Sequence, residues 1–423
     1  MIQDIKKVDP LEKIAFGALL IYVFTIPNEA IFISNSFGSA SRIAGIILFV
    51  LWIYTLAIKG SVIKPPFEAL LFLLFLWFSI TSTLWSVSPE RTIARNITLT
   101  QNIVLMFIMI FLVKKSVTRL KTVWLAYVTG TLATALMIIY LYLTGYATIL
   151  WKEYERYAAY DQDPNTIAVM LSIGLILSLF LFYDATSSLF QIIYLATAAF
   201  LIIGIVLTGS RGGIFTALSA LIYPILYSKR TVFKGMALSL ALGAAFFGAL
   251  LFLPGNITGR YKVTVDQIKA GHIETTGRYA YWIAGIKQFS EAPLLGHGGS
   301  SFRVVITEQP DIVTQKVAHN VPIQILVDYG ILGIILLFTP IGSSLIRMKN
   351  DKIMFRKISY LVLIWFLGGL SLSYEANKIT WFVFGITLCA VNIIERRLKQ
   401  ARRKKNLTVP TSKHSTNFQQ IAF

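Results

Sequence analysis

Long apolar stretches separated by short polar breaks dominate this sequence. A helix needs roughly 20 mostly apolar residues to cross the hydrocarbon core of a bilayer. By this measure the sequence predicts about twelve membrane-spanning helices, at residues 11–29, 39–58, 65–84, 97–113, 119–144, 166–184, 188–208, 212–228, 233–253, 319–346, 358–373 and 377–394. The expected fold is therefore an all-α, polytopic integral membrane protein.

Composition supports this class. Of the 423 residues, 56% are hydrophobic and 14% are charged, whereas soluble domains carry about 25% charged residues. The first apolar stretch has no small-residue cleavage site and further spans follow it, so we expect a retained helix rather than a signal peptide. Cys389 is the single cysteine and lies in the last span, where we expect a packing role, so no disulfide or cysteine-based metal site is predicted.

The net charge of +19 does not predict nucleic-acid binding, because the basic residues form short clusters between apolar spans. Such clusters orient membrane helices, with the basic segments on the cytoplasmic side. If the N-terminus is cytoplasmic and the spans alternate, 25 of the 39 Lys and Arg residues fall in cytoplasmic segments. This bias predicts that both termini are cytoplasmic.

The chain divides into four regions on this topology: residues 1–253 with nine spans, a large outer loop at 254–318, three spans at 319–395, and a basic tail at 396–423. Helical apolar spacing at Tyr261–Ala270 and Arg278–Phe289 predicts that the large loop folds on the membrane surface. The tail is expected to contact lipid headgroups and then become disordered.

A glycine-rich segment, Thr208–Gly213, interrupts two spans at their outer ends. Glycines let the backbone approach a ligand closely, and N–H groups at the start of the next helix favour an anion. Arg211 adds a forked guanidinium that suits phosphate, so Ser210, Gly212 and Gly213 are candidate substrate-binding residues beside it. The alternative is a tight turn whose arginine reaches the lipid headgroups.

Two further outer segments could carry chemistry. Arg278 and Trp282 lie in the large loop; the alternative is a surface arginine and an interfacial aromatic anchor. His319 and Asn320 lie where the tenth span begins, so a proton-accepting imidazole would be reachable by a lipid-borne substrate and by water. The alternative there is a polar helix cap.

Several other polar residues are weaker candidates. Asp161 and Asp163 form an Asp-x-Asp pair that could hold a divalent metal, but Pro164 follows, and we favour Asp163 or Asn165 as the cap of the sixth span. Glu375 is a candidate partner for an active-site arginine or histidine, or else a solvated turn carboxylate. Arg91 and Arg95 are candidate auxiliary contacts to an anionic group of a substrate.

The order and spacing of these segments resemble the O-antigen ligase and polymerase superfamily of bacterial membrane glycosyltransferases. The pattern His-[Asn/Ser/Gln]-x9-Gly-x-x-[Gly/Thr/Tyr] is met by His319, Asn320, Gly330 and Gly333. Other matching elements are Ser210–Gly213, Gly277-Arg278 with Trp282, Pro293–Gly298, and Leu84-Trp85-Ser86 with Pro89. The resemblance covers roughly residues 65 to 390.

The resemblance implies a GT-C-like membrane enzyme that moves glycan from an undecaprenyl-diphosphate carrier to an acceptor hydroxyl on the periplasmic side of the bacterial inner membrane. Arg211 and Arg278 would clamp the diphosphate, and His319 would be the base. Because diphosphate is a good leaving group, we expect an inverting transferase that needs no metal or cofactor.

The full His-Asn-x9-Gly-x-x-Gly match favours ligation of O-antigen to lipid A core in lipopolysaccharide biosynthesis. A polymerase of the same superfamily, with a carrier-linked glycan as acceptor, is the alternative. A flippase or transporter of polysaccharide precursors is a third hypothesis, but transporters place polar groups near the bilayer midplane, whereas the ionisable residues here gather at one surface.

Overall fold

The computed structural model describes residues 10–29, 39–59, 64–114, 116–146, 156–159, 162–227, 232–251, 278–308 and 315–408. Within these ranges the chain forms helices and turns and no β-strand, which confirms the all-α prediction. The predicted surface helix at Tyr261–Ala270 and the acidic residue Asp161 lie outside the described residues.

Most of the helices coincide with predicted spans. They are α1 (Pro10–Thr25), α2 (Ala40–Lys59), α3 (Phe67–Thr81), η1 (Ser82–Leu84), α4 (Pro89–Val113), α5 (Val117–Leu143), α6 (Pro164–Asp184), α7 (Ser188–Leu207), α8 (Arg211–Leu221), α9 (Tyr223–Tyr227), α10 (Val232–Leu251), α12 (Arg278–Glu291), α13 (Phe302–Val305), η4 (Ile306–Glu308), α14 (Val321–Met348), α15 (Lys352–Gly369) and α16 (Lys378–Thr408).

Eight helices in the described part of the chain are long and apolar enough to cross a membrane: α2 to α7, α14 and α16. The four other predicted spans coincide with α1, the α8–α9 pair, α10 and α15, which are shorter or less apolar. Eight candidate spans are therefore found, and a total of twelve stays a prediction.

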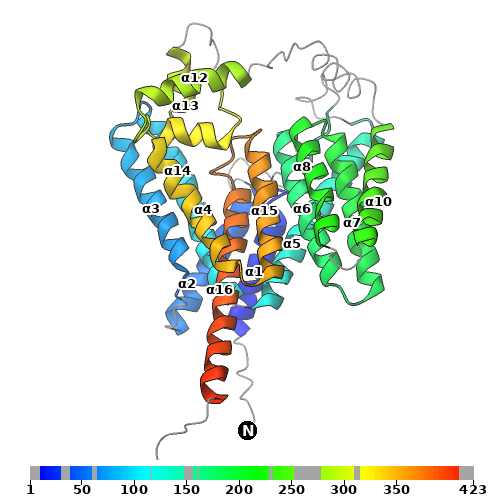
Figure 1. The fold of residues 1–423 in the computed structure, drawn as a ribbon. Coiled ribbons are helices and arrows are strands. Elements are labelled where there is room, and N and C mark those ends of the chain that lie inside the picture. The colour runs from blue at the N-terminus through cyan, green and yellow to red at the C-terminus, as the bar shows by residue number, and fades with distance from the viewer. Residues whose placement is uncertain are drawn as a thin grey trace, which may run out of the picture.

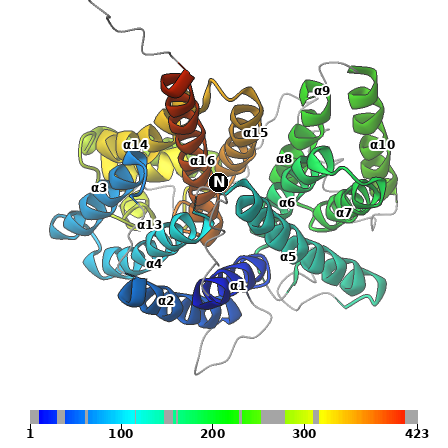
Figure 2. The same ribbon diagram turned by 90° about the horizontal axis from the view of Figure 1, so that it is seen from below.

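The long helices run side by side, with α16 at the centre (Figures 1 and 2). Within the 18-residue apolar stretch of α16, 89% of the residues are buried inside the bundle. This is expected for a helix whose surface is apolar on all sides. The start of α1 and the end of α16 lie at one end of the bundle, which we call the termini end. Helices α12 and α13 lie across the opposite end, which we call the α12 end.

Two helix boundaries differ from the predicted spans in ways that matter below. Helix α4 begins at Pro89, where proline fits the first helical position, and this extra length carries Arg91 and Arg95. Helix α16 continues to Thr408, whereas the sequence predicted a disordered tail from residue 396. Arginine, lysine, glutamine and alanine are strong helix formers, and cations favour a helix C-terminus.

At the termini end, carboxylates are held by cations on neighbouring helices. Glu12 of α1 pairs with Arg119 at 2.8 Å and with Lys114. Asp184 of α6 pairs with Lys121 at 3.0 Å and with Lys357. Glu68 of α3, fully buried, pairs with Arg347 of α14 at 2.8 Å. These pairs connect helices that are distant in sequence.

Candidate active site

The turn between α15 and α16, residues 370–377, is where the predicted segments meet. Arg278 Nη1 donates a hydrogen bond to the Ser371 carbonyl at 3.2 Å. The Asn320 backbone N–H donates to Ser373 Oγ at 3.3 Å. Arg95 forms an ion pair with Glu375. Three helices, α4, α12 and α14, are thus brought to one turn at the α12 end.

The Ser210–Gly213 segment forms the start of α8. Ser210 caps the helix by accepting the Gly213 N–H at 3.1 Å. Gly212 lies against the turn so closely that a Cβ at this position would overlap Ser371 Oγ. The glycine therefore permits the close approach that sets Arg211, the exposed first residue of α8, beside the turn.

Arg278 begins α12 and lies close to Arg211. Burial lowers the pKa of Arg278, the positive charge of Arg211 lowers it further, and Asp163 partly offsets both effects. Among the described residues, two guanidinium groups thus lie near one carboxylate, that of Asp163. Such an arrangement suits a phosphate-bearing ligand.

Trp282 lies one helical turn after Arg278 on α12. Its indole Nε1–H donates to the Ala318 carbonyl at 2.7 Å. The two side chains of this element therefore contact two neighbouring segments. Arg278 bonds to the turn between α15 and α16, and Trp282 bonds to the backbone next to His319. This contact gives Trp282 a positioning role, and substrate contact by Trp282 stays a prediction.

His319 occupies an uncommon backbone conformation immediately before α14. Its φ is 49°, in the left-handed region that residues other than glycine rarely adopt. Asn320 then caps α14 by accepting the Ile323 N–H at 3.1 Å, and its amide donates to the Leu370 carbonyl at 3.4 Å. These bonds, with the Ser373 contact, hold His319 in its strained position.

The His319 imidazole is held in its neutral form in the free protein. The pKa falls to about 4, chiefly through burial and then through the charge of Arg278; Asp163 opposes this shift, and Lys316 and Arg303 add to it. The ring is therefore neutral near pH 7. Its Nδ1 is buried and has no hydrogen-bond partner among the described residues, so a ligand group could occupy that position.

A buried polar chain below His319 was not singled out from the sequence. Gln324 Oε1 accepts the Ala318 N–H at 3.2 Å, and Gln324 Nε2 donates to Asp328 at 2.8 Å. Asp328 also accepts backbone N–H groups of Ser300 at 3.0 Å and Phe302 at 2.8 Å. The available signal was an ionisable residue inside an apolar span, which by default indicates a functional site.

The second glycine-rich loop docks on a break in α14. Gly330 has φ 64° and ψ −162°, which only glycine adopts readily. At this break the Ile331 N–H donates to the Pro293 carbonyl at 2.9 Å, and the His297 N–H donates to the Val327 carbonyl at 2.9 Å. The nine-residue spacing thus places His319 at the start of α14 and the docking break about three turns along it.

The weaker candidates have defined places. Glu375 is 4% exposed and pairs with Arg95, so the interpretation as a solvated turn carboxylate was wrong. Arg91 Nη2 donates to Gln315 Oε1 at 2.8 Å, just before His319 in the chain. Asp163 caps α6 by accepting the Asn165 N–H at 3.1 Å, which confirms the capping prediction.

A buried arginine missed in the sequence supports the same region. Arg156, 6% exposed, donates from Nε to the Thr208 carbonyl at 2.9 Å and from Nη2 to Asn165 Oδ1 at 2.9 Å. It therefore links the end of α7, just before Ser210, to the start of α6. One basic residue in a polar loop gives no sequence signal of burial.

A cavity of about 860 Å³ lies beside the site, between α1, α2, α4, α6 and the start of α16. Its wall includes Asp163, whose charge acts on His319 and Arg278, and Ala376 and Asn377, which follow Glu375. Polar residues such as Ser39, Ser41 and Arg42 line part of it, and apolar residues such as Ile46, Phe49, Val104 and Leu105 line another part.

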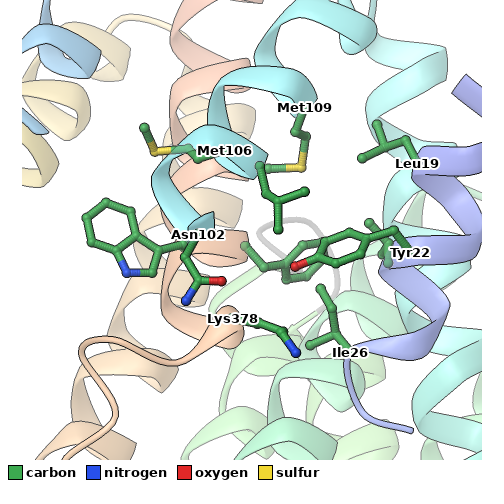
Figure 3. Close-up of a pocket in the computed structure, with 11 residues that line it drawn as sticks. Leu19, Tyr22, Ile26, Asn102, Met106, Met109 and Lys378 are labelled. Atoms are coloured by element: carbon green, nitrogen blue, oxygen red, sulfur yellow. The ribbon is translucent and has the colours of Figure 1, made fainter. Parts of the chain in front are cut away.

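A narrower space of about 20 Å³ shares four lining residues with this cavity: Tyr22, Asn102, Leu105 and Lys378. Figure 3 shows Asn102 and Lys378 on one side of this space and the thioethers of Met106 and Met109 on the other. The combined volume has polar and apolar walls, as an amphiphilic ligand requires.

No group of three or more His, Cys, Asp or Glu side chains that could hold a metal ion is found in the described ranges. Cys389 is buried at 1% exposure within α16 and is a free thiol, as expected for a packing residue.

Comparison with known proteins places the resemblance on the same residues. The family model described as O-antigen ligase matches residues 196–338, an interval that contains the Ser210–Gly213, Arg278–Trp282 and His319–Gly333 segments. A Rickettsia felis protein named "Putative polysaccharide ligase" is 27% identical over 190 residues, which span 42% of this chain and 43% of the relative. The match thus covers less than half the length of that relative. The resemblance of this chain to the O-antigen ligase and polymerase superfamily, predicted from its motifs, is confirmed.

Proposed function

We propose that this chain is a glycosyltransferase that moves an oligosaccharide or polysaccharide from undecaprenyl diphosphate to an acceptor hydroxyl, and that its acceptor is lipid A core. The carrying observation is that His319, Arg278 and Arg211 gather at one turn: Arg278 bonds to Ser371, the backbone next to His319 bonds to Ser373, and Gly212 lies against Ser371. The neutral imidazole is acted on by the charge of Arg278, which in turn is acted on by that of Arg211. The complete His-Asn-x9-Gly-x-x-Gly pattern favours the ligase over the polymerase.

The reaction we propose is a direct displacement. The acceptor hydroxyl attacks the anomeric carbon of the donor sugar, and the bond from that carbon to the diphosphate oxygen breaks. His319 takes the hydroxyl proton, and the diphosphate leaves with the bonding electrons beside Arg211 and Arg278, which stabilise its charge. Displacement from the opposite face inverts the anomeric configuration, and this chemistry requires no metal.

The position of the site supports a lipid-linked substrate. His319 lies at the start of a candidate membrane span, and the cavity of about 860 Å³ lies beside it. Its mixed polar and apolar walls suit the lipid-proximal part of an amphiphile. In our proposal the protein is a GT-C-like inner-membrane enzyme with twelve spans, cytoplasmic termini and a periplasmic α12 end.

A reconstituted transfer assay tests the proposal. Wild-type and His319→Ala proteins would receive undecaprenyl-diphosphate-linked glycan, with lipid A core or without added acceptor, and each reaction would be run with and without EDTA. We expect glycan on lipid A core, unaffected by EDTA and reduced about 10²- to 10⁴-fold in the variant.

The other outcomes separate the competing functions. Elongated carrier-linked glycan in the tube without added acceptor would identify a polymerase. Movement of unchanged lipid-linked sugar across the vesicle membrane, without transfer in either tube, would identify a transporter. Full activity of a correctly inserted His319→Ala protein would exclude His319 as the base.

A further inference from the structure

A second group of arginines lies near His319, separate from Arg211 and Arg278. Arg91 and Arg95 are four residues apart on α4 and so lie on one face of that helix. Arg303 belongs to α13, whose first residue, Phe302, is held by Asp328 of α14 at 2.8 Å. Burial lowers the pKa of Arg303, and the charges of Arg91 and Arg95 lower it further, whereas Asp328 opposes the shift. The starts of α4 and α13 are also joined directly, because Thr92 donates to the Gly299 carbonyl at 2.6 Å and the Ser86 and Ser301 hydroxyls lie 3.1 Å apart. The three side chains are therefore neighbours.

Positive charge exceeds negative charge in this group. Arg95 pairs with Glu375, and Arg91 is bonded to the neutral amide of Gln315. Asp328 is already engaged by Gln324 and by two backbone N–H groups. Within the described ranges no hydrogen bond or ion pair joins Arg303 to an acceptor. Even with both carboxylates ionised, three arginines face two negative charges among the side chains that the structure describes.

Each of the two arginine groups has a member whose charge acts on His319. The charges of Arg278 and of Arg303 both act on the His319 ring. Arg211 and Arg278 belong to α8 and the start of α12, whereas Arg91 and Arg95 belong to α4. Helices α4 and α8 lie on opposite sides of α15 and α16 in both views of the fold (Figures 1 and 2). A base that borders two cationic groups suits a transfer reaction in which both the donor and the acceptor carry negative charge.

We propose that Arg91, Arg95 and Arg303 form a second anion-binding site, which holds a phosphate group of the acceptor substrate while Arg211 and Arg278 hold the donor diphosphate. This inference rests on the proposed function and adds a feature of the acceptor: it must carry a phosphate monoester or a diphosphate near the reacting hydroxyl. Glu375 holds Arg95 in place, and Gln315 holds Arg91. Among the described residues, Arg303 is the member of the group that no acceptor engages.

Kinetics with paired acceptors test the second site. The assay would use lipid A core with its sugar phosphates and the same core after phosphatase treatment, in phosphatidylcholine nanodiscs. We expect Arg303→Gln to raise KM for the phosphorylated acceptor about ten- to hundredfold, to leave the donor KM unchanged, and to have no effect with the dephosphorylated acceptor. Arg303→Lys should recover part of the loss. Arg396→Gln, an exposed arginine at the termini end, is the matched control.

Three kinetic results would overturn the assignment. They are a raised donor KM in Arg303→Gln, an equal rise in KM for both acceptors, and no change in either. Adding phosphatidylglycerol to the nanodiscs distinguishes the source of the phosphate. If this lipid abolishes the difference between wild type and Arg303→Gln, the arginines bind lipid headgroups and the acceptor assignment is wrong.

A binding measurement keeps this test independent of transfer. Calorimetric titration of the solubilised full chain with inorganic pyrophosphate should find two sites. Arg211→Gln with Arg278→Gln should remove one, and Arg91→Gln with Arg303→Gln should remove the other. A single site that only the first pair removes would overturn the proposal. Absence of all transfer by the wild type would instead reject the proposed function, whatever the titration shows.

Discussion

The two ends of the bundle use charge in opposite ways. At the termini end, Glu12 and Asp184 are each held by two cations, and Glu68 pairs with Arg347. At the α12 end, arginines lie near one another and near a histidine, with fewer carboxylates than cations in the described part. Burying like charges together costs free energy. A surplus of cations among the described residues near a strained, partly buried histidine therefore favours binding of an anion, as we propose, whereas matched pairs favour a structural role.

In this comparison, the largest expected effect is the difference in kcat/KM between replacing an arginine at the α12 end and replacing one at the termini end. Arg278→Gln should lower kcat/KM for transfer by about 10²- to 10³-fold, because it removes a cation that stabilises the leaving diphosphate. Arg119→Gln removes a cation from a carboxylate that keeps Lys114 as partner, so transfer per folded molecule should change less than about twofold. Steady-state kinetics on reconstituted proteins of equal folded content would measure both. Similar losses in the two variants would contradict the division between the ends.

The next effect concerns pH. In our proposal His319 is the base, a role that requires the neutral ring, and the lowered pKa of about 4 keeps it neutral through pH 5 to 7 in the free protein. We expect kcat/KM to be flat across that range and to fall about tenfold per pH unit below the pKa. Bound diphosphate would raise the pKa of His319, so kcat should decline at a higher pH than kcat/KM does.

The pH profiles of both parameters, measured on one preparation whose thermal stability is followed at each pH, would check this. A decline of kcat/KM centred near 6.5 would show an unperturbed histidine and would contradict the burial of His319. A decline of kcat at a lower pH than kcat/KM would contradict the placement of the diphosphate beside the ring.

The smallest expected effect on transfer comes from the termini end. Glu12→Gln leaves Lys114 and Arg119 without their carboxylate, and these cations are 30% and 19% exposed, so water partly compensates them. We expect a loss of about 1–3 kcal/mol of stability and no change in kcat of the folded protein. Thermal unfolding in detergent would report the first, and the transfer assay the second. A fall in kcat without a fall in unfolding temperature would contradict the purely structural role that we assign to the ion pairs at the termini end.

Much of the site was predictable because its segments are short and local. Ser210–Gly213, Arg278 and Trp282, and His319 with Gly330 were recognisable by residue type and spacing. The supporting residues were not. Ser371 and Ser373 act through a carbonyl and a hydroxyl that any outer turn could offer. Gln324, Asp328 and Arg156 act through burial, which a single sequence does not report.

For two predicted site residues, the structure shows contacts with the protein itself that the sequence did not indicate. Asn320 was a candidate substrate-binding residue, and it is bonded as the cap of α14 and to Leu370. Glu375 was either an active-site partner or a solvated carboxylate, and it is buried against Arg95. In both cases the side chain fixes a backbone or an arginine near His319, so substitution would act on the site through geometry.

The sequence alone determined the helical class, the approximate positions of the spans and the order of the candidate segments. In a bilayer an apolar segment satisfies its backbone polar groups within its own helix, so these features depend on local sequence. Only the tertiary structure decided which segments meet at the turn between α15 and α16, and that His319 is strained and partly buried. It also decided that, among the described residues, the carboxylates of one end are matched by cations while cations outnumber carboxylates at the other. Proximity, burial and the pKa of a side chain depend on residues far away in the chain, and the packing of the helices sets those distances.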